Sequence, residues 1–180
     1  MKKFSVRDMV MCALFAALTA VCSQIQIPLP AIPINLALFA VLLCAGLLRP
    51  TAAVLAMVVY VVLGLVGVPV FAGMRGGMAV LFGKTGGYIL GYILCALIVG
   101  ALSRKFAFSF KNLCLEMLLG VAVCYAFGTI WFMAVTGLNL ATSMSYCVIP
   151  FLPGDAVKIL LAAFLALRLR KPLAAQGFAA

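Results

Sequence analysis

The 180-residue sequence contains no histidine and only three acidic residues, Asp8, Glu116 and Asp155. Without histidine the chain lacks the commonest general base and the usual ligand of catalytic zinc, which argues against most hydrolytic and metal-dependent chemistry. Its seven cysteines include no C-x-x-C pair, so neither a disulfide framework nor a cysteine-based metal site is expected. We therefore expect a protein that is not an enzyme and that carries no cofactor and no metal.

Charge of either sign is also scarce, because charged residues make up 9% of the chain, hydrophobic residues 68%, and the mean hydropathy is +1.33. Soluble domains are about 25% charged and about 45–50% apolar, so an ordinary soluble fold is excluded. A transmembrane helix needs about 20 residues, and six such helices leave no room for a second domain. The composition predicts an all-α membrane protein with six transmembrane helices and one integral membrane domain, residues 1–180.

Apolar runs and the residues that interrupt them place the six predicted helices. Their expected ranges are 8–23, 35–48, 51–66, 88–102, 113–135, and a last one that follows the turn 150–155 and ends at Arg168, Arg170 and Lys171. The first run also resembles a signal peptide, but Val21 stands where cleavage at Cys22 would require a small residue, so a retained helix is expected. The proline-rich segment 24–33 and the glycine-rich segment 71–88 predict irregular backbone.

Basic residues are distributed unevenly between the two sides of this topology. The opposite side from the termini holds three, Arg75, Lys84 and Lys158. The side of the termini holds the other ten: Lys2, Lys3, Arg7, Arg49, Arg104, Lys105, Lys111, Arg168, Arg170 and Lys171. The positive-inside rule therefore places both termini in the cytoplasm and the proline-rich and glycine-rich segments outside. We interpret the net charge of +10 as a consequence of membrane orientation. It does not indicate nucleic-acid binding, because no basic stripe interleaved with aromatic residues is present.

A carboxylate and an ammonium group follow the last outer turn, in the run Pro153-Gly154-Asp155-Ala-Val-Lys158. Their spacing of three puts them on one helix face, where Asp155 either caps the helix locally or forms part of a binding site with Lys158. Ionisable groups near the apolar zone are costly and mark functional sites. A ligand with both N–H donors and a carboxylate suits the pair. No carboxylate lies at mid-membrane to carry a proton, so a binding subunit energised by partners fits better than a self-powered pump.

The glycine-rich segment is not a nucleotide-binding loop, because Met78 stands where a P-loop preceding Lys84 needs glycine. Its glycines predict either tight backbone close to a ligand or neighbouring helix, or an ordinary loop. In the first helix, Ala13 and Ala17, like Ala16 and Ala20, are spaced as small-x-x-x-small pairs. Such a face permits close helix approach in lipid, either to a partner or within the protein.

Two stretches resemble the BioY family, the biotin-binding S components of energy-coupling factor (ECF) transporters. They are GLVGVPVFAG (64–73), continued by Gly76-Gly77 and by GKTGGY (83–88), and PFLPGDAVK (150–158). The resemblance implies six helices and high-affinity biotin binding and uptake from outside a bacterial plasma membrane. It suggests a substrate-binding set of Asp155, Lys158, Tyr88, Phe71, Thr85, Gly77, Gly86, Gly87 and Asn35. Whether Lys158 meets the ureido oxygen or the carboxylate of biotin stays open.

The resemblance also implies partners, namely a transmembrane coupling protein and two cytoplasmic ATPases, with Ala13 and Ala17 as the docking surface. The chain departs from the family pattern at four positions, with Lys84 for proline, Arg75 for a small residue, Asn35 for threonine and Ala37 for glutamine. Two other functions stay open from the sequence. One is an S component or stand-alone transporter for another small solute, and the other is a membrane-embedded enzyme that acts on lipids.

Overall fold

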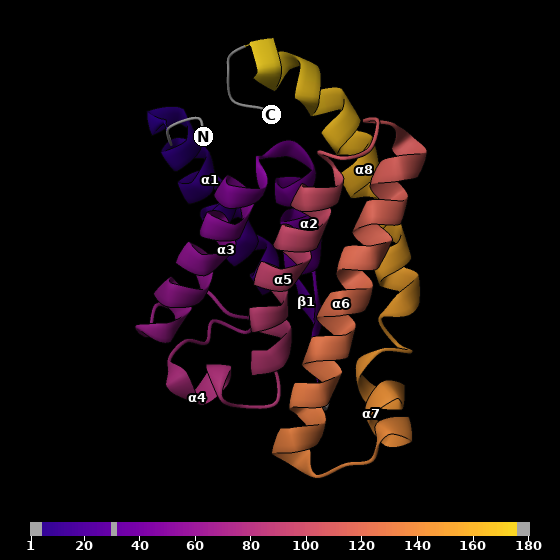
Figure 1. Cartoon of the computed structure of the whole chain (residues 1–180). Coiled ribbons are helices and arrows are strands. Elements are labelled where there is room, and N and C mark those ends of the chain that lie inside the picture. Colours follow the sequence, from indigo (N-terminus) through magenta and orange to yellow (C-terminus); the bar gives the residue numbers. More distant parts are fainter. Residues whose placement is uncertain (1–4, 30–31, 176–180) are drawn as a thin grey trace.

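The computed structural model describes residues 5–29 and 32–175, and these form a helical bundle with one small β-hairpin (Figure 1). Each of the six predicted spans corresponds to one helix. The helices are α1 (Val6–Gln24), α2 (Ala37–Leu47), α3 (Pro50–Leu65), α4 (Met78–Leu81), α5 (Gly86–Leu102), α6 (Phe110–Thr136), α7 (Leu140–Cys147) and α8 (Leu152–Ala175), and the strands are β1 (Gln26–Ile27) and β2 (Ile34–Asn35).

Three features differ from the sequence prediction. The short helices α4 and α7 were not predicted, and α8 begins at Leu152, so that Pro153 lies in its first turn, where the missing N–H of proline costs no hydrogen bond. The proline-rich segment is also not wholly irregular. Its flanks pair as the antiparallel strands β1 and β2, with Gln26 opposite Asn35.

Helix length separates the six predicted spans into two groups. In the described part of the chain, α1 and α6 are each long and apolar enough to cross a membrane, and α7 with α8 forms a third candidate span bent by 52°. The other three, α2, α3 and α5, are shorter apolar helices. The predicted all-α membrane architecture is confirmed, with a helix at each of the six expected ranges. By length and composition, two of the described helices, or three with the bent pair, are long enough to cross a membrane, so the count of six spans stays a prediction.

Helix α2 lies at the centre of the bundle, where it packs against α1, α3, α5, α6 and α8. All of its residues except Phe39 are buried. With 11 residues it is about 16 Å long, roughly half the hydrocarbon thickness of about 30 Å. The bundle is therefore filled in its middle and has room at both ends of α2.

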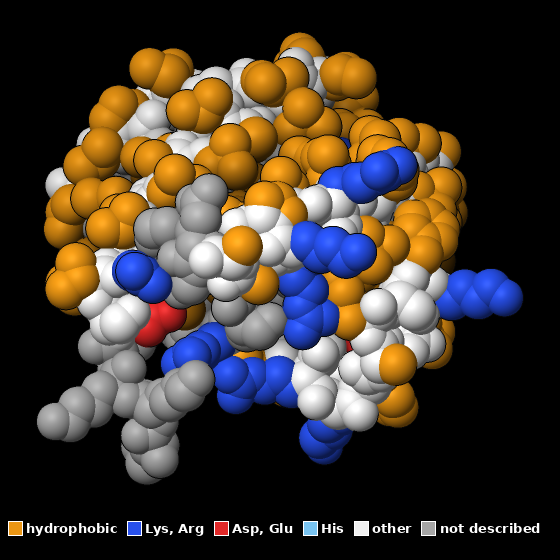
Figure 2. Space-filling view, turned by 90° about the horizontal axis from the view of Figure 1, so that it is seen from above, with side chains coloured by type: hydrophobic (Ala, Val, Ile, Leu, Met, Phe, Trp, Pro, Cys, Tyr) orange, Lys and Arg blue, Asp and Glu red, His pale blue; other side chains and the backbone are white. Residues whose placement is uncertain are grey.

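Helix α1 begins and α8 ends at the same end of the bundle (Figure 1). Viewed from that end, lysine and arginine side chains gather on the face (Figure 2). Asp8 belongs to this end, and its carboxylate accepts a hydrogen bond from the backbone N–H of Ser5 in a capping box that starts α1. This gathering of basic residues at the end of the termini agrees with the predicted charge asymmetry. Two of the residues counted in that prediction, Lys2 and Lys3, lie outside the described residues.

The glycine-rich segment packs against the far end of α1. Ser23 Oγ donates to the carbonyl of Val70 at 2.5 Å, and Gln24 Nε2 donates to the carbonyl of Phe71 at 3.2 Å. Gly76 allows the loop to fold on itself, because a Cβ there would lie 2.4 Å from the carbonyl oxygen of Val68. These contacts hold Phe71 over the end of the bundle opposite the termini, which is the outer end in the predicted topology.

Candidate functional site

A cavity of about 550 Å³ lies at the outer end of α2, opposite the end where the basic residues gather. It is bounded by the start of α2, the glycine-rich segment, α5, α6 and the start of α8. Its lining residues are Gln26, Pro28, Leu29, Ile32, Pro33, Asn35, Leu38, Tyr60, Phe71, Ala72, Gly73, Arg75, Ala79, Val80, Gly83, Lys84, Thr85, Tyr88, Ile89, Tyr92, Cys124, Tyr125, Phe151, Asp155 and Lys158. Its volume falls in the range of about 300–1,000 Å³ that is typical of small-molecule sites.

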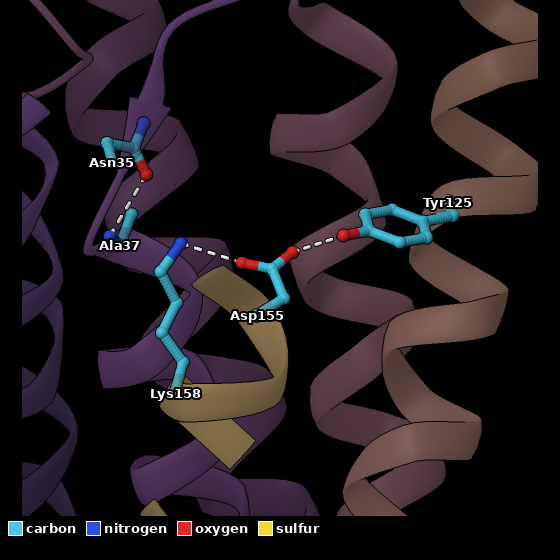
Figure 3. A network of polar contacts seen from close by, with 5 residues as sticks. All are labelled: Asn35, Ala37, Tyr125, Asp155 and Lys158. Atoms are coloured by element: carbon cyan, nitrogen blue, oxygen red, sulfur yellow. Dashed lines mark hydrogen bonds and ion pairs between the residues drawn. The ribbon is translucent and has the colours of Figure 1, made fainter. Parts of the chain in front are cut away.

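An ion pair from the first turns of α8 forms the polar part of this cavity. Asp155 is 3% exposed and Lys158 is 6% exposed, and Lys158 Nζ lies 2.7 Å from Asp155 Oδ1. The hydroxyl of Tyr125 on α6 donates to the other carboxylate oxygen, Oδ2. Lys158 and Tyr125 thus approach the carboxylate from opposite sides (Figure 3). A buried charge needs this kind of compensation, because desolvation of an isolated ion is costly.

These contacts bear on the two interpretations of Asp155. The hydrogen bonds of its side chain go to Lys158 and Tyr125, both of which line the cavity. Its side chain makes no hydrogen bond to a backbone N–H of α8 within the described residues, so local helix capping does not account for it. The carboxylate is therefore a cavity group, held by one charged donor and one neutral donor.

Asn35 brings a further polar group to the same cavity. Its Oδ1 accepts a hydrogen bond from the backbone N–H of Ala37 at 3.0 Å, which fixes the turn into α2 (Figure 3). The Nδ2 of Asn35 is a second donor beside Lys158 for oxygen atoms of a ligand. On the acceptor side, Oε1 of Gln26 is buried and has no hydrogen-bond partner among the described residues. The cavity therefore offers both donors and acceptors.

Aromatic side chains form much of the rest of the wall. Tyr60 packs edge-to-face on Phe71 with ring centroids 5.6 Å apart, and lies 6.5 Å from Tyr92. The hydroxyl of Tyr88 is hydrogen-bonded to Thr129 Oγ1 at 2.9 Å, so this tyrosine presents its ring to the cavity. Such rings suit a flat or aliphatic ligand whose polar groups are confined to its ends.

The structure brings six of the nine predicted substrate-binding residues to the cavity wall. These are Asp155, Lys158, Tyr88, Phe71, Thr85 and Asn35. The other three, Gly77, Gly86 and Gly87, do not line it. A Cβ on Gly86 would lie 1.6 Å from the carbonyl oxygen of Leu81, and one on Gly87 would lie 2.2 Å from Cβ of Trp131, while Gly77 has a φ of 91°. The geometry of these three glycines is explained by close chain packing and by the turn.

Sequence reasoning missed Tyr125, Tyr60, Tyr92 and Gln26 as cavity residues. Tyrosines within apolar helices are the available signal, since a buried hydroxyl requires a hydrogen-bond partner. That signal does not show which partner each one has. The departures Arg75 and Lys84 also line the cavity, and both side chains are exposed. They add two positive charges at its outer side.

The predicted docking residues lie outside this site, on α1. Ala13 and Ala17 are both exposed, whereas Ala16 is 2% exposed and packs inside the bundle. Large exposed apolar residues surround the first pair on the same helix: Met9, Val10, Leu14 and Val21. The two small-x-x-x-small pairs therefore face different directions, one outward and one into the protein.

Comparison with known proteins identifies the family of the chain. The family model described as the BioY family matches residues 1–175. "Biotin transporter BioY" of Thermotoga maritima is 38% identical over 92% of this chain and 96% of that protein, and "Probable biotin transporter BioY" of Pyrococcus horikoshii is 35% identical over 91% and 96%. A crystal structure of the S-component for biotin from an ECF-type ABC transporter superimposes with a TM-score of 0.85 at 26% identity, over 95% of this chain and 94% of that one. The chain therefore belongs to the BioY family.

Proposed function

We propose that this chain binds biotin and is the substrate-binding S component of an ECF transporter in a bacterial plasma membrane. A transmembrane coupling protein and two cytoplasmic ATPases would supply the energy. The observation that carries the proposal is the buried pair of Asp155 and Lys158 inside the outer cavity. The ureido ring of biotin has two N–H donors beside one carbonyl acceptor, and this pair offers the complementary acceptor and donor. Binding and uptake, and not catalysis, account for the site.

The rest of the cavity matches the rest of biotin. The aromatic wall suits the thioether ring and the aliphatic chain. Because Lys158 Nζ lies 2.7 Å from Asp155, a ureido ring that donates to Asp155 is within reach of Lys158 through its carbonyl oxygen. This favours the ureido oxygen as the partner of Lys158. The carboxylate of biotin then lies toward the outer cations Arg75 and Lys84.

The inner floor of the cavity is closed, which supports a need for partner subunits. Below the cavity, Val41, Leu42 and Cys44 of the central helix α2 are each 0% exposed. An apolar, close-packed floor leaves no polar path for a carboxylate through the bundle. Translocation of biotin therefore requires movement of the subunit or of its helices, and we propose that the partner subunits drive this movement.

Direct titration of the purified full-length protein tests the proposed function. We expect saturable binding of biotin, retained binding of desthiobiotin, which keeps the ureido ring, and weaker binding of lipoate, which has a carboxylate but no ureido group. Absence of biotin binding together with saturable binding of another vitamin would assign the chain to a different solute. Tighter binding of lipoate than of desthiobiotin would overturn the ureido assignment.

Replacing Tyr125 with phenylalanine should weaken biotin binding by roughly fivefold to tenfold. The change removes one neutral hydrogen bond to Asp155, worth about 1 kcal/mol, while the ring continues to fill the wall. Isothermal titration of the variant measures the effect. Tyr146→Phe is the matched control, because that exposed tyrosine does not line the cavity and should leave affinity unchanged. Equal affinity of Tyr125→Phe and wild type would show that the hydroxyl does not organise the site.

Neutralising Arg75 and Lys84 together should slow biotin association and reduce its dependence on salt. Both cations are exposed at the cavity, so they act on an incoming carboxylate mainly through the long-range field. Stopped-flow measurements at low and high ionic strength should show a difference of several-fold at low salt that disappears at high salt. A salt-independent loss of affinity would show that the two side chains act by direct contact instead.

A further inference from the structure

A second cavity, of about 730 Å³, lies at the opposite end of α2. It is lined by the end of α2, the turn into α3, the end of α5, the segment between α5 and α6, and α8. The lining residues are Gly46, Leu47, Leu48, Arg49, Thr51, Gly100, Ser103, Arg104, Phe106, Phe108 and Arg170. The short central helix thus leaves a cavity at each of its two ends, and the inner one is on the face where basic residues gather (Figure 2).

The inner cavity is selectively lined with arginine. Arg49, Arg104 and Arg170 contribute to it, and none of the described lining residues is acidic. The side chains of Arg49 and Arg104 have no hydrogen bond or ion pair with any residue that the structure describes. The guanidinium of Arg170 lies over the ring of Phe108, with Cζ 3.8 Å from its centroid. Glu116 is the acidic residue closest in sequence to Arg104. Its side chain is 3% exposed, and its carboxylate accepts a hydrogen bond from Ser103 Oγ at 2.6 Å.

Membrane topology alone does not explain why the cavity is lined by arginine and not by lysine. The positive-inside rule is met equally by lysine and arginine, and Lys105 and Lys111 of the same connecting segment do not line the cavity. Arginine differs from lysine in presenting a planar fork of N–H donors that matches the oxygens of phosphate. The two forks of Arg49 and Arg104, with the positive charge of Arg170 on the same cavity, indicate a phosphate-bearing ligand.

Apolar side chains are exposed beside the arginines. Phe106, which lines the cavity, is 57% exposed, Phe110 at the start of α6 is 40% exposed, and Leu169 next to Arg170 is 38% exposed. A free anion or an acidic protein segment has no need of such a flank, whereas a phospholipid carries acyl chains directly below its phosphate. We propose that the inner cavity binds the phosphate headgroup of an anionic phospholipid, with its acyl chains against these side chains.

The test uses the purified full-length protein in detergent, with phosphatidylglycerol as the anionic probe, phosphatidylcholine as the zwitterionic lipid and inorganic phosphate as the free anion. Native mass spectrometry measures retained lipid. We expect wild type to retain phosphatidylglycerol in preference to phosphatidylcholine. The variant Arg49→Ala with Arg104→Ala should retain it roughly tenfold less, because each change removes hydrogen bonds to phosphate that are weakened by water at these partly or fully exposed side chains. Inorganic phosphate at millimolar concentration should not displace it.

Lys105→Ala provides the matched control, because it removes a neighbouring positive charge that does not line the cavity, and it should retain lipid as wild type does. Equal losses in Lys105→Ala and in the arginine variant would show a diffuse charge effect and overturn the site. Displacement of lipid by inorganic phosphate, or tighter binding of a hexaglutamate peptide than of phosphatidylglycerol, would overturn the lipid assignment. A wild-type circular dichroism spectrum of the arginine variant shows that its loss of lipid is not a loss of fold.

Discussion

Replacing Asp155 with asparagine should weaken biotin binding roughly a hundredfold. The carboxylate is buried, so its hydrogen bonds to ligand donors form without competition from water, and a charge-assisted bond of this kind is worth about 1.5–3 kcal/mol. The loss of charge also leaves the buried ammonium group of Lys158 beside a neutral side chain in place of its counter-ion. Isothermal titration of the purified variant measures the loss.

A double variant distinguishes a role in binding from a role in stability. Removing one member of a buried ion pair destabilises a protein by about 3–5 kcal/mol, whereas replacing both with neutral groups of similar volume is often neutral. Asp155→Asn combined with Lys158→Met should therefore recover the melting temperature that Asp155→Asn loses, without recovering biotin affinity. If affinity returned with stability, the pair would be a structural ion pair and the ligand contacts would lie elsewhere in the cavity.

The helices could be predicted from the sequence because their signals are local. Apolar runs broken by proline, glycine and clusters of arginine or lysine mark where a helix begins and ends, and each of the six predicted spans corresponds to an observed helix. What could not be predicted is the position of α2. An apolar run looks the same whether it faces lipid or protein, and only the packing of five other helices around it shows that α2 is central and short. Both cavities depend on that position.

From the residues alone, the site was predictable only where its members are neighbours in sequence. The resemblance to the BioY family added four more cavity residues, Asn35, Phe71, Thr85 and Tyr88. Asp155 and Lys158 are three residues apart, and their shared face follows from helix geometry. Tyr125 reaches the same carboxylate from 30 residues away, a contact that depends on how α6 packs beside α8. The same limit applies to Gly87. The sequence indicates that backbone approaches something closely there, and the structure shows that the neighbour is Trp131 and not the cavity.

Replacing Ala17 with tryptophan should abolish partner-driven biotin uptake while leaving biotin affinity within about twofold of wild type. Ala17 is exposed on α1, and Ala13 lies one turn away on the same exposed face. Their small apolar side chains project less from the helix than the larger residues around them. Small residues let two helices approach closely in lipid. If the coupling protein docks on this face, as the family resemblance implies, a large ring at this point separates its helix from α1. Because Ala17 does not line the outer cavity, binding should persist. Uptake of labelled biotin by cells that express the full transporter measures the first quantity, and titration of the purified variant measures the second.

Ala122→Trp is the matched control for this prediction. Ala122 is an exposed alanine on α6, another helix that is long and apolar enough to cross a membrane. A tryptophan at this position adds the same bulk to an apolar surface away from α1. We expect this variant to transport biotin normally, since lipid accommodates a tryptophan that a close helix contact does not. Loss of uptake in the control and normal uptake in Ala17→Trp would place the docking surface on α6. Equal loss in both would show that bulk on the bundle impairs movement of the subunit in the bilayer, independently of where the coupling protein binds.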